Sequence, residues 1–266
     1  MISIITPVYN GERFIEQCLQ TVIDQGCDSI EHIIVDGHST DQTISIVQHY
    51  AERYSHIRWI SEPDRGQSDA MNKGISIANK SIIGFLNVDD HYEPNAVNQA
   101  LSLFRTLPEP SFVIANCNIW DDHDRLVEIN KPAKLRLIDL VQGLNVTPFP
   151  CNPSAYFYHR SLHDQIGYYA TDDHYAMDLD FILRAVQVAN MVYVNETWGN
   201  YRRIEGTKTF IDIAAGNGDR RILQLMRKYR RQLSVFERIQ ILILKLDRAR
   251  QFLTILPVRA VRRLLR

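Results

Sequence analysis

Short β-branched runs alternate with longer amphipathic runs through the first hundred residues, and this alternation constrains the fold more than any other feature of the sequence. A strand followed by a helix, repeated along the chain, is the pattern of βαβ units with parallel strands. Runs such as Ile82–Asn87 are apolar almost throughout, which is typical of strands covered on both faces. We therefore predict an α/β fold with a mainly parallel sheet flanked by helices. The expected strand–helix pairs are Ile2–Thr6 with Glu12–Gln25, His32–Asp36 with Gln42–Tyr54, Ile57–Ser61 with Gln67–Asn79, and Ile82–Asn87 with Pro94–Arg105.

The alternation loosens from about Phe112, where the connecting segments become longer and richer in polar residues and proline. Long loops on a rigid scaffold are where binding and catalytic residues concentrate. We therefore expect this part to continue the same domain and to complete its site. The expected elements are strands over Phe112–Cys117, Ala155–His159 and Val192–Asn195, a helix over Asp178–Asn190, and a loop over Thr147–Pro153.

Basic residues are concentrated near the C-terminus. Residues 220–266 hold 14 of the 30 Lys and Arg residues but only two of the 31 acidic residues, so this segment carries +12 and Met1–Asp219 carries −13. We expect amphipathic helices over Gln232–Leu256 and Pro257–Arg266, and such basic faces lie on anionic membrane surfaces. Packing on the body of the protein and contact with a second copy of the chain remain alternatives. Nucleic acid is not an expected partner, because the acidic remainder would repel phosphate.

The four cysteines form no CxxC pair and no dense framework. We therefore expect free thiols rather than a zinc site or a disulfide scaffold. The N-terminal residues lack the features of a signal peptide, and no run approaches the roughly 18–20 apolar residues of a membrane span. These features predict a cytoplasmic protein, which the basic segment would hold as a peripheral protein on the cytosolic face of the inner membrane.

Familiar phosphate-binding and metal-binding motifs are missing. The residues after the first expected strand, Pro7–Gly11, do not form GxGxxG, and Gly206–Thr209 lacks the glycine spacing of a Walker A loop. His159 and His163 are four residues apart but lack the glutamate of HExxH, so we expect both on the surface.

Polar residues follow each of the first four expected strands. In an open parallel sheet the carboxyl ends of the strands share one edge, and ligands bind in the crevice there. Carboxylates brought together at this edge would repel one another unless a divalent cation or hydrogen-bond donors compensate. The segments are Thr6–Asn10, Asp36–Asp41, Glu62–Gly66 and Asn87–Asp90.

These segments resemble motifs of glycosyltransferase family 2, and Asn87-Val88-Asp89 resembles the DxD-type motif of nucleotide-sugar glycosyltransferases with the GT-A fold. The resemblance covers about residues 1–205. It implies a GT-A domain over residues 1–215, with a nucleotide-binding half (1–110) and an acceptor half (111–215), followed by a basic helical tail (216–266). The matching segments, in family order and at family spacing, are Ile5–Asn10, Ile34–Asp41, Ser61–Gly66, Asp69–Gly74 and Leu86–Asp90.

The resemblance also implies roles for single residues in the nucleotide-binding half. Pro7, Tyr9 and Glu12 would line the base and ribose pocket, and Asp36 would accept a hydrogen bond from the imide N–H of the base. Asp64 would lie near the base or ribose. An aspartate at a strand end is also an ordinary turn residue, so this assignment depends on the whole set.

The same resemblance assigns a metal and a diphosphate contact. Asp89 would hold Mg²⁺ or Mn²⁺ through the donor diphosphate, with Asp90 adjacent toward the donor sugar. Many relatives carry an arginine where this chain has Met71, so Lys73 is the nearest substitute for that cation. Arg202 is a further candidate for the phosphates, because guanidinium groups pair bidentately with phosphate.

Asp178 opens a segment that resembles the family's later acidic motif, in which one aspartate is the catalytic base. A carboxylate at the start of a helix is also favoured by the helix dipole alone. The resemblance implies an inverting hexosyltransferase that moves a sugar from a nucleotide donor, expected to be a UDP-sugar, to a hydroxyl group. The acceptor would be a saccharide or a polyprenyl-diphosphate-linked saccharide in cell-surface polysaccharide synthesis, such as O-antigen.

Two other functions remain open from the sequence. A sugar nucleotidyltransferase would need a glycine-rich basic signature near the first strand, and the acidic Pro7–Glu12 region argues against it. A non-catalytic nucleotide-sugar binding or scaffold protein would keep the donor pocket without needing Asp178.

Overall fold

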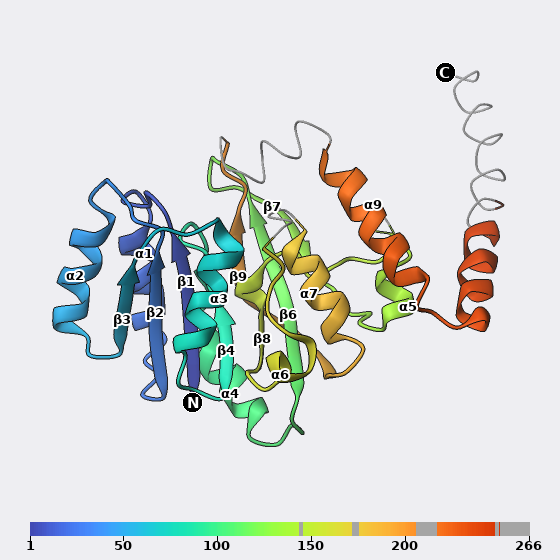
Figure 1. The fold of residues 1–266 in the computed structure, drawn as a ribbon, viewed down its shortest axis with the longest axis horizontal. Helices are drawn as coiled ribbons and strands as arrows, with labels where there is room; N and C mark the ends of the chain where they lie inside the picture. The colour runs from blue at the N-terminus through green and yellow to red at the C-terminus, as the bar shows by residue number, and fades with distance from the viewer. Residues whose placement is uncertain (144–145, 172–175, 206–216, 248–249, 251–266) are drawn as a thin grey trace.

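A computed structural model describes residues 1–143, 146–171, 176–205, 217–247 and 250. The described chain forms a nine-stranded sheet with helices packed on both faces (Figure 1). The strand order is β3-β2-β1-β4-β8-β6-β9-β5, and β7 pairs with β6 outside this path. The expected α/β class with a flanked sheet is confirmed.

The N-terminal half is the parallel part of the sheet. Its strands pair in the register Val8–Asp36–Ser61, so the carboxyl ends of β1, β2 and β3 lie side by side. Alternate residues of these strands face opposite layers: Ile5 packs with residues of α3, and Ile4 packs with residues of α1. The elements are β1 (Ile2–Val8), α1 (Ile15–Ile23), β2 (Ile30–Asp36), α2 (Thr43–Arg53), β3 (Ile57–Ser61), α3 (Gln67–Ile77) and β4 (Ile82–Phe85).

The second half makes the sheet mixed. β8 (Tyr156–His159) runs antiparallel to both β4 and β6 (Ser111–Trp120), whereas β9 (Asn190–Arg202) is parallel to β6. The remaining elements are β5 (His91–Tyr92), α4 (Ala96–Phe104), β7 (Leu126–Asn130), α5 (Leu137–Leu140), the 3-10 turn η1 (Pro153–Ala155), α6 (Leu162–Ile166), α7 (Met177–Ala185) and α9 (Asn217–Arg230). The expected strands over Phe112–Cys117, Ala155–His159 and Val192–Asn195 correspond to β6, β8 and β9, and the expected helices over Pro94–Arg105 and Asp178–Asn190 correspond to α4 and α7. The short elements β5, β7, α5, η1 and α6 were not predicted from the sequence.

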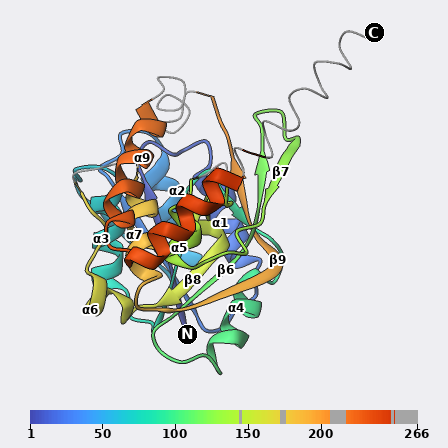
Figure 2. The same cartoon turned by 90° about the vertical axis from the view of Figure 1, so that its right-hand side faces the viewer.

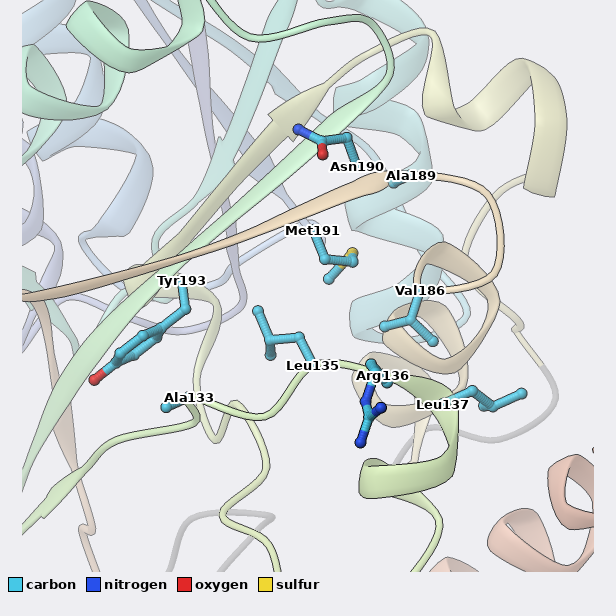
Figure 3. Close-up of a pocket in the computed structure, with 9 residues that line it drawn as sticks. All are labelled: Ala133, Leu135, Arg136, Leu137, Val186, Ala189, Asn190, Met191 and Tyr193. Carbon is cyan, nitrogen blue, oxygen red and sulfur yellow. The ribbon is translucent and has the colours of Figure 1, made fainter. Parts of the chain in front are cut away.

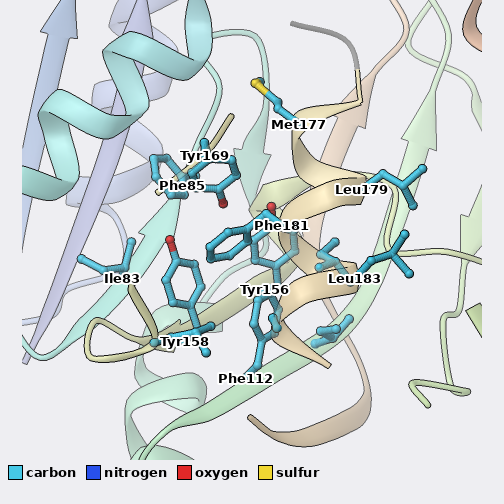
Figure 4. Close-up of a cluster of buried hydrophobic side chains, with 14 of the residues drawn as sticks. Ile83, Phe85, Phe112, Tyr156, Tyr158, Tyr169, Met177, Leu179, Phe181 and Leu183 are labelled. Carbon is cyan, nitrogen blue, oxygen red and sulfur yellow. The ribbon is translucent and has the colours of Figure 1, made fainter. Parts of the chain in front are cut away.

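Aromatic packing fixes α7 against the sheet (Figure 4). The ring of Phe181 from α7 stacks on Tyr169, with centroids 4.3 Å apart, and Phe112 of β6 stacks on Tyr158 of β8 at 5.2 Å. All four rings are buried. Because α7 is anchored through Phe181, its first turn is held over the carboxyl-end edge of the sheet.

His159 and His163 are both buried, so the expectation that they lie on the surface is wrong. Nδ1 of His159 accepts a hydrogen bond from the backbone N–H of Ser111, and Nε2 of His163 bonds the Tyr158 hydroxyl at 3.0 Å. Burial lowers the pKa of His163 to about 4. Aromatic neighbours from distant segments made these positions part of the core, which spacing alone does not reveal.

The basic C-terminal segment begins as part of the body. Met226, Tyr229 and Leu233 are buried, and the Tyr229 hydroxyl donates to Asp180 of α7 at 2.8 Å. The expected helix over Gln232–Leu256 is broken at its start, and a separate helix covers residues 235–247, where Ser234 and Glu237 form a capping box. The expected helix Pro257–Arg266 lies outside the described residues. None of the helices that the structure describes has the length and apolar character needed to span a membrane.

Gly74 sets the close approach of α3 to β1. A Cβ atom at this position would overlap Cγ2 of Ile5 and lie 3.2 Å from Cγ2 of Val35. We expect Gly74→Ala to destabilise the protein by about 1–3 kcal/mol, because overpacking a dense core outweighs the higher helix propensity of alanine. Urea unfolding measures this change. Ser76→Ala on the exposed side of the same helix is the control and should shift stability by no more than about 0.5 kcal/mol; equal effects of the two substitutions would refute the packing argument.

Candidate functional site

Three loops meet where β1, β2 and β3 end. A Cβ atom placed on Gly37 would lie 2.5 Å from Oδ2 of Asp64 and 3.5 Å from Cβ of Tyr9. Gly37 therefore lets the side chains of Asp64 and Tyr9 both approach its backbone at the strand ends. The Tyr9 side chain is 64% exposed, so its ring is open to a ligand, whereas Pro7 is buried in β1.

Asp36 is fully buried and already hydrogen-bonded. Its carboxylate accepts from the backbone N–H groups of His38 and Ser39, from the Ser39 hydroxyl, and from the Ser61 hydroxyl at 2.7 Å. Three of these donors bond Oδ2, and only the Ser39 hydroxyl bonds Oδ1. Because a carboxylate oxygen has two lone pairs, Oδ1 keeps one further acceptor position.

Glu12 supports the neighbouring loop. Its carboxylate accepts from the backbone N–H of Gln42 at 2.9 Å, and its own N–H donates to Asp41 at 3.0 Å. These bonds join the β1–α1 loop to the start of α2. The Glu12 side chain is exposed and is only three residues from Tyr9 in the sequence. Its hydrogen bonds stabilise the loop itself.

Half-buried Asp89 and buried Asp90 form an acidic pair after β4. Burial raises the pKa of Asp89, and burial together with the neighbouring charge of Asp89 raises the pKa of Asp90 well above its usual range. Amide groups rather than cations support Asp90: Asn152 donates at 2.7 Å and Asn87 at 2.9 Å. The pair is thus hydrogen-bonded but electrostatically under-compensated.

Arg202, at the end of β9, reaches this acidic pair. Its backbone N–H donates to Asp90 at 3.2 Å, and its positive charge opposes the rise in the pKa of Asp89. The guanidinium also contacts Gln17 at 3.3 Å and the well-exposed Asp124 at 3.7 Å. These are weak surface contacts, which an incoming phosphate group can replace.

Asp178 lies in the first turn of α7, where the Tyr156 hydroxyl donates to its Oδ1 at 3.3 Å. The adjacent Met177, which Figure 4 shows at the start of the helix, contacts the Ser68 hydroxyl at 2.7 Å. Gln67, the residue before Ser68, donates to Asn87 at 2.9 Å. A chain of contacts therefore leads from the start of α7 through the start of α3 to the acidic pair.

Lys73 is occupied away from the acidic pair. Its amine donates to the carbonyl of Pro63 at 2.7 Å and pairs with Glu62 at 3.0 Å. Met71 is a buried core residue. Lys73 therefore lies against the loop after β3, and the pairs that the structure describes give it no contact with Asp89 or Asp90. Arg202 is the predicted basic residue that lies beside the acidic pair.

The sequence matches the family model of Glycosyl transferase family 2 over residues 3–167. The chain belongs to glycosyltransferase family 2. It is 30% identical over 240 residues to the uncharacterized glycosyltransferase Rv1514c of Mycobacterium tuberculosis, a match that covers 86% of this chain and 85% of that protein. It is also 30% identical over 201 residues to the uncharacterized glycosyltransferase EpsJ of Bacillus subtilis, covering 72% of this chain and 58% of EpsJ. This family-2 chain thus spans little more than half the length of EpsJ.

Solved structures share the fold of this family-2 glycosyltransferase. Residues 1–349 of S. aureus TarS, in complex with UDP-GlcNAc, align with a TM-score of 0.62 and 19% identity, covering 78% of this chain and 60% of that chain. The mannosyltransferase PcManGT from Pyrobaculum calidifontis, in complex with GDP-Man and Mn²⁺, aligns with a TM-score of 0.57 and 16% identity, covering 93% of this chain and 79% of that chain. The GT-A fold expected from the sequence is confirmed.

The acidic pair fits a divalent cation that the protein would share with a ligand. Within the described ranges no group of three His, Cys, Asp or Glu side chains is placed to hold a metal ion. Mg²⁺ is commonly held by one or two carboxylates together with substrate phosphates and water. Two adjacent carboxylates with raised pKa values supply such a partial ligand set.

Three supporting residues of this glycosyltransferase site were not predicted from the sequence. Asn152 bonds Asp90, Tyr156 bonds Asp178, and Ser61 bonds Asp36. The proline-punctuated loop signalled that residues near Asn152 could matter. Tyr156 is an ordinary residue of the expected strand Ala155–His159, and nothing in the sequence indicates its contact with Asp178.

A hollow of about 450 Å³ lies elsewhere on the protein (Figure 3). Leu135, Val186 and Met191 contribute apolar walls, and Arg136 lies at its rim beside Asp139, with which it forms an ion pair at 2.7 Å. None of the predicted site residues lines it. It is therefore separate from the strand-end site.

The acidic pair makes a testable contribution to stability. Because the folded pKa of Asp89 is raised, ionisation at high pH destabilises the fold, and stability is regained as the pH falls through that pKa. In chelator and without ligand, Asp89→Asn should be more stable than the unmodified protein at pH 8, by about 1.4 kcal/mol for each unit by which the pKa is raised. Urea unfolding at pH 8 and at pH 4 tests this, and the two proteins should converge at pH 4.

Asp28→Asn is the matched control, since Asp28 is exposed and lies just before the start of β2, at the opposite end of the strand from the site. It removes the same charge and should leave stability within about 0.5 kcal/mol at both pH values. An Asp89→Asn variant no more stable than Asp28→Asn at pH 8 would show that the acidic pair carries no electrostatic strain.

Proposed function

We propose that the protein is an inverting glycosyltransferase that moves a sugar from a UDP-sugar to a hydroxyl group of a saccharide or lipid-linked acceptor in cell-surface polysaccharide synthesis. The observation that carries the proposal is the contact chain from Met177, the residue before Asp178, to Asp90. It runs through Ser68 and Gln67 at the start of α3 and then through Asn87. A candidate base and a candidate diphosphate site thus share one edge of the sheet. The complex of TarS with UDP-GlcNAc, on the same fold, supports this donor class.

The nucleoside would lie on the β1–β2–β3 side of this edge. The open ring of Tyr9 offers a stacking surface, and Asp64, like Tyr9, packs against Gly37. Asp36 would accept from the base through Oδ1, which receives only the Ser39 hydroxyl. Pro7 and Glu12 would shape the pocket through the loop that carries Tyr9.

The diphosphate would lie between the acidic pair and Arg202. Asp89 and Asp90 would hold Mg²⁺ or Mn²⁺ together with the diphosphate oxygens, and the cation would neutralise charge that develops on the leaving group. The Mn²⁺ complex of PcManGT supports this choice of ion. Arg202 would pair with the same oxygens through its planar guanidinium. Lys73 is not assigned a contact, because its amine is bound to Glu62 and Pro63.

Asp178 would act as the general base. In a single displacement the acceptor oxygen attacks the anomeric carbon, its proton passes to the carboxylate, and the bond to the diphosphate breaks with inversion. A positioned carboxylate of this kind contributes typically about 10²–10⁴-fold. The buried Tyr156 hydroxyl donates to one oxygen of Asp178 and so restrains the orientation of the carboxylate that would take the proton.

The basic C-terminal segment would place the reaction at the cytosolic face of the inner membrane. An acceptor linked to polyprenyl diphosphate is presented at that surface. The +12 charge of residues 220–266 favours anionic lipids over a freely diffusing state.

Replacement of the base tests the reaction. We expect Asp178→Asn to lower the rate of sugar transfer by about 100-fold or more while UDP affinity stays within about twofold, because the amide cannot take the proton. A screen of nucleotide sugars with Mn²⁺, measuring released nucleoside diphosphate, gives the rate, and calorimetry gives the affinity.

Asp180→Asn is a matched control on the same helix. It breaks the contacts of Asp180 with Arg184 and Tyr229, so it should lower stability but leave the rate per folded molecule within about threefold. Full transfer by Asp178→Asn, or release of no nucleoside diphosphate from any donor, would contradict the proposed reaction.

A cation shared between Asp89 and the diphosphate makes the affinity for UDP depend on the metal ion. Mn²⁺ should strengthen UDP binding to the unmodified protein by about tenfold or more, because the ion joins the carboxylates to the diphosphate. Asp89→Asn should lose this gain, whereas Asp122→Asn, on the exposed β6–β7 turn, should keep it. Titration of UDP with Mn²⁺ and with chelator makes the measurement; equal gains in the two variants would argue against Asp89 as a metal ligand.

A further inference from the structure

Three arginines line a cavity of about 250 Å³ where the end of α9 meets the helix over residues 235–247. They are Arg230, Arg231 and Arg238, and the buried Ile241 forms the remaining wall. In Figure 1 the junction of these two helices lies on the right-hand side of the molecule, and in Figure 2 this side faces the viewer. We call this junction the arginine elbow.

Main-chain carbonyls hold two of the three arginines, Arg230 and Arg238, in place. Arg230 donates to the carbonyls of Val141 and Gln142, and Arg238 donates to those of Leu233 and Arg231. Neutral acceptors fix the guanidinium groups but leave their charge uncompensated. In the described part of the chain no carboxylate forms an ion pair with any of the three arginines.

An apolar surface adjoins the elbow. Phe236 is 69% exposed and Leu242 is 56% exposed, although both lie on a well-formed helix. At 100° per residue, six of the seven exposed apolar side chains of this helix fall in one continuous stripe, with Arg238 along its edge and Ile241 on the opposite, buried side. The seventh, Leu244, lies outside the stripe. The stripe consists of Val235, Phe236, Ile239, Leu242, Ile243 and Leu246.

We propose that the arginine elbow binds the phosphate group of an anionic glycerophospholipid, with the apolar stripe inserted among the acyl chains beside it. This inference deepens the proposed function, since it rests on an enzyme that works at a membrane. A guanidinium fork matches phosphate oxygens in geometry and charge. An amphipathic helix with an open apolar face and basic flanks is the ordinary form of an interfacial anchor.

Other occupants fit the surface less well. Free phosphate would satisfy the arginines but leave six apolar side chains in water. A second copy would bring together two segments of +12 charge. A phospholipid headgroup with its acyl chains matches both parts of the surface at once.

The elbow is mechanically linked to the candidate active site. Tyr229, one residue before Arg230, bonds Asp180, and Asp180 is two residues from Asp178 on the same helix. A lipid held at the elbow would therefore fix the orientation of α7 relative to the membrane.

Vesicle binding by the full-length chain tests the inference. Phosphatidylcholine vesicles are given the same negative surface potential with either phosphatidylglycerol or oleate, so that only one set carries an anionic phosphate. We expect the unmodified protein to prefer the phosphatidylglycerol vesicles by about tenfold in co-sedimentation. The double variant Arg231→Gln/Arg238→Gln should bind both sets equally, with Arg230 kept because it anchors α9 to the body.

Arg220→Gln/Arg227→Gln is the matched control, since it removes two charges from α9 outside the cavity. It should bind both sets more weakly but keep the preference for phosphate. Ile239→Ser/Leu242→Ser should weaken binding to both vesicle sets by about tenfold, because it removes exposed apolar area without touching the arginines.

Each remaining outcome is decisive. Equal binding of the unmodified protein to the two vesicle sets, or loss of the preference in the α9 control, overturns the phosphate site. A dimer in sedimentation equilibrium that Ile239→Ser/Leu242→Ser disrupts, with no vesicle binding, assigns the stripe to a second copy and overturns the inference. Release of nucleoside diphosphate without vesicles should be unchanged in the arginine variants, so failure of the proposed reaction is detected separately through Asp178→Asn.

Discussion

Burial of carboxylates at one edge of the sheet is the constraint on which the site depends. Asp36 is stabilised by four donors, whereas the Asp89–Asp90 pair receives amides and one neighbouring guanidinium and keeps raised pKa values. Water would solvate these charges better than the folded protein does, so the parallel half of the sheet supplies the packing energy that keeps them there. The under-compensated pair gains most from a ligand that brings positive charge.

The parallel half of the fold could be predicted because its signals are local. The pattern of continuous apolar runs and amphipathic runs predicted β3 with its observed bounds. It also predicted the observed start of α3 and placed the end of that helix two residues too late. The second half depends on distant contacts. β7 is an exposed strand paired along one side only, and His163 is buried by rings from three other segments, so neither shows a pattern in its own sequence.

The same distinction separates the site residues. Parallel strands bring Asp36, Asp64 and Asp89 to one edge wherever the register falls, so their proximity follows from the fold class. Orientation does not follow. The amine of Lys73 forms an ion pair with Glu62, a nearby carboxylate. The Tyr156 hydroxyl bonds Asp178 because aromatic packing sets the position of α7. Roles that depend on side-chain direction need the structure.

α7 joins the two regions of opposite charge. Its first turn carries Asp178 above the acidic edge, and two residues later Asp180 receives Tyr229 from the basic segment. A helix of nine residues is a rigid connection of roughly 14 Å, with a rise of about 1.5 Å per residue. Whatever surface orients α9 therefore also orients the candidate base. Under the proposed function, an acceptor carried on that surface would meet Asp178 from one fixed direction, whereas an acceptor free in solution would not.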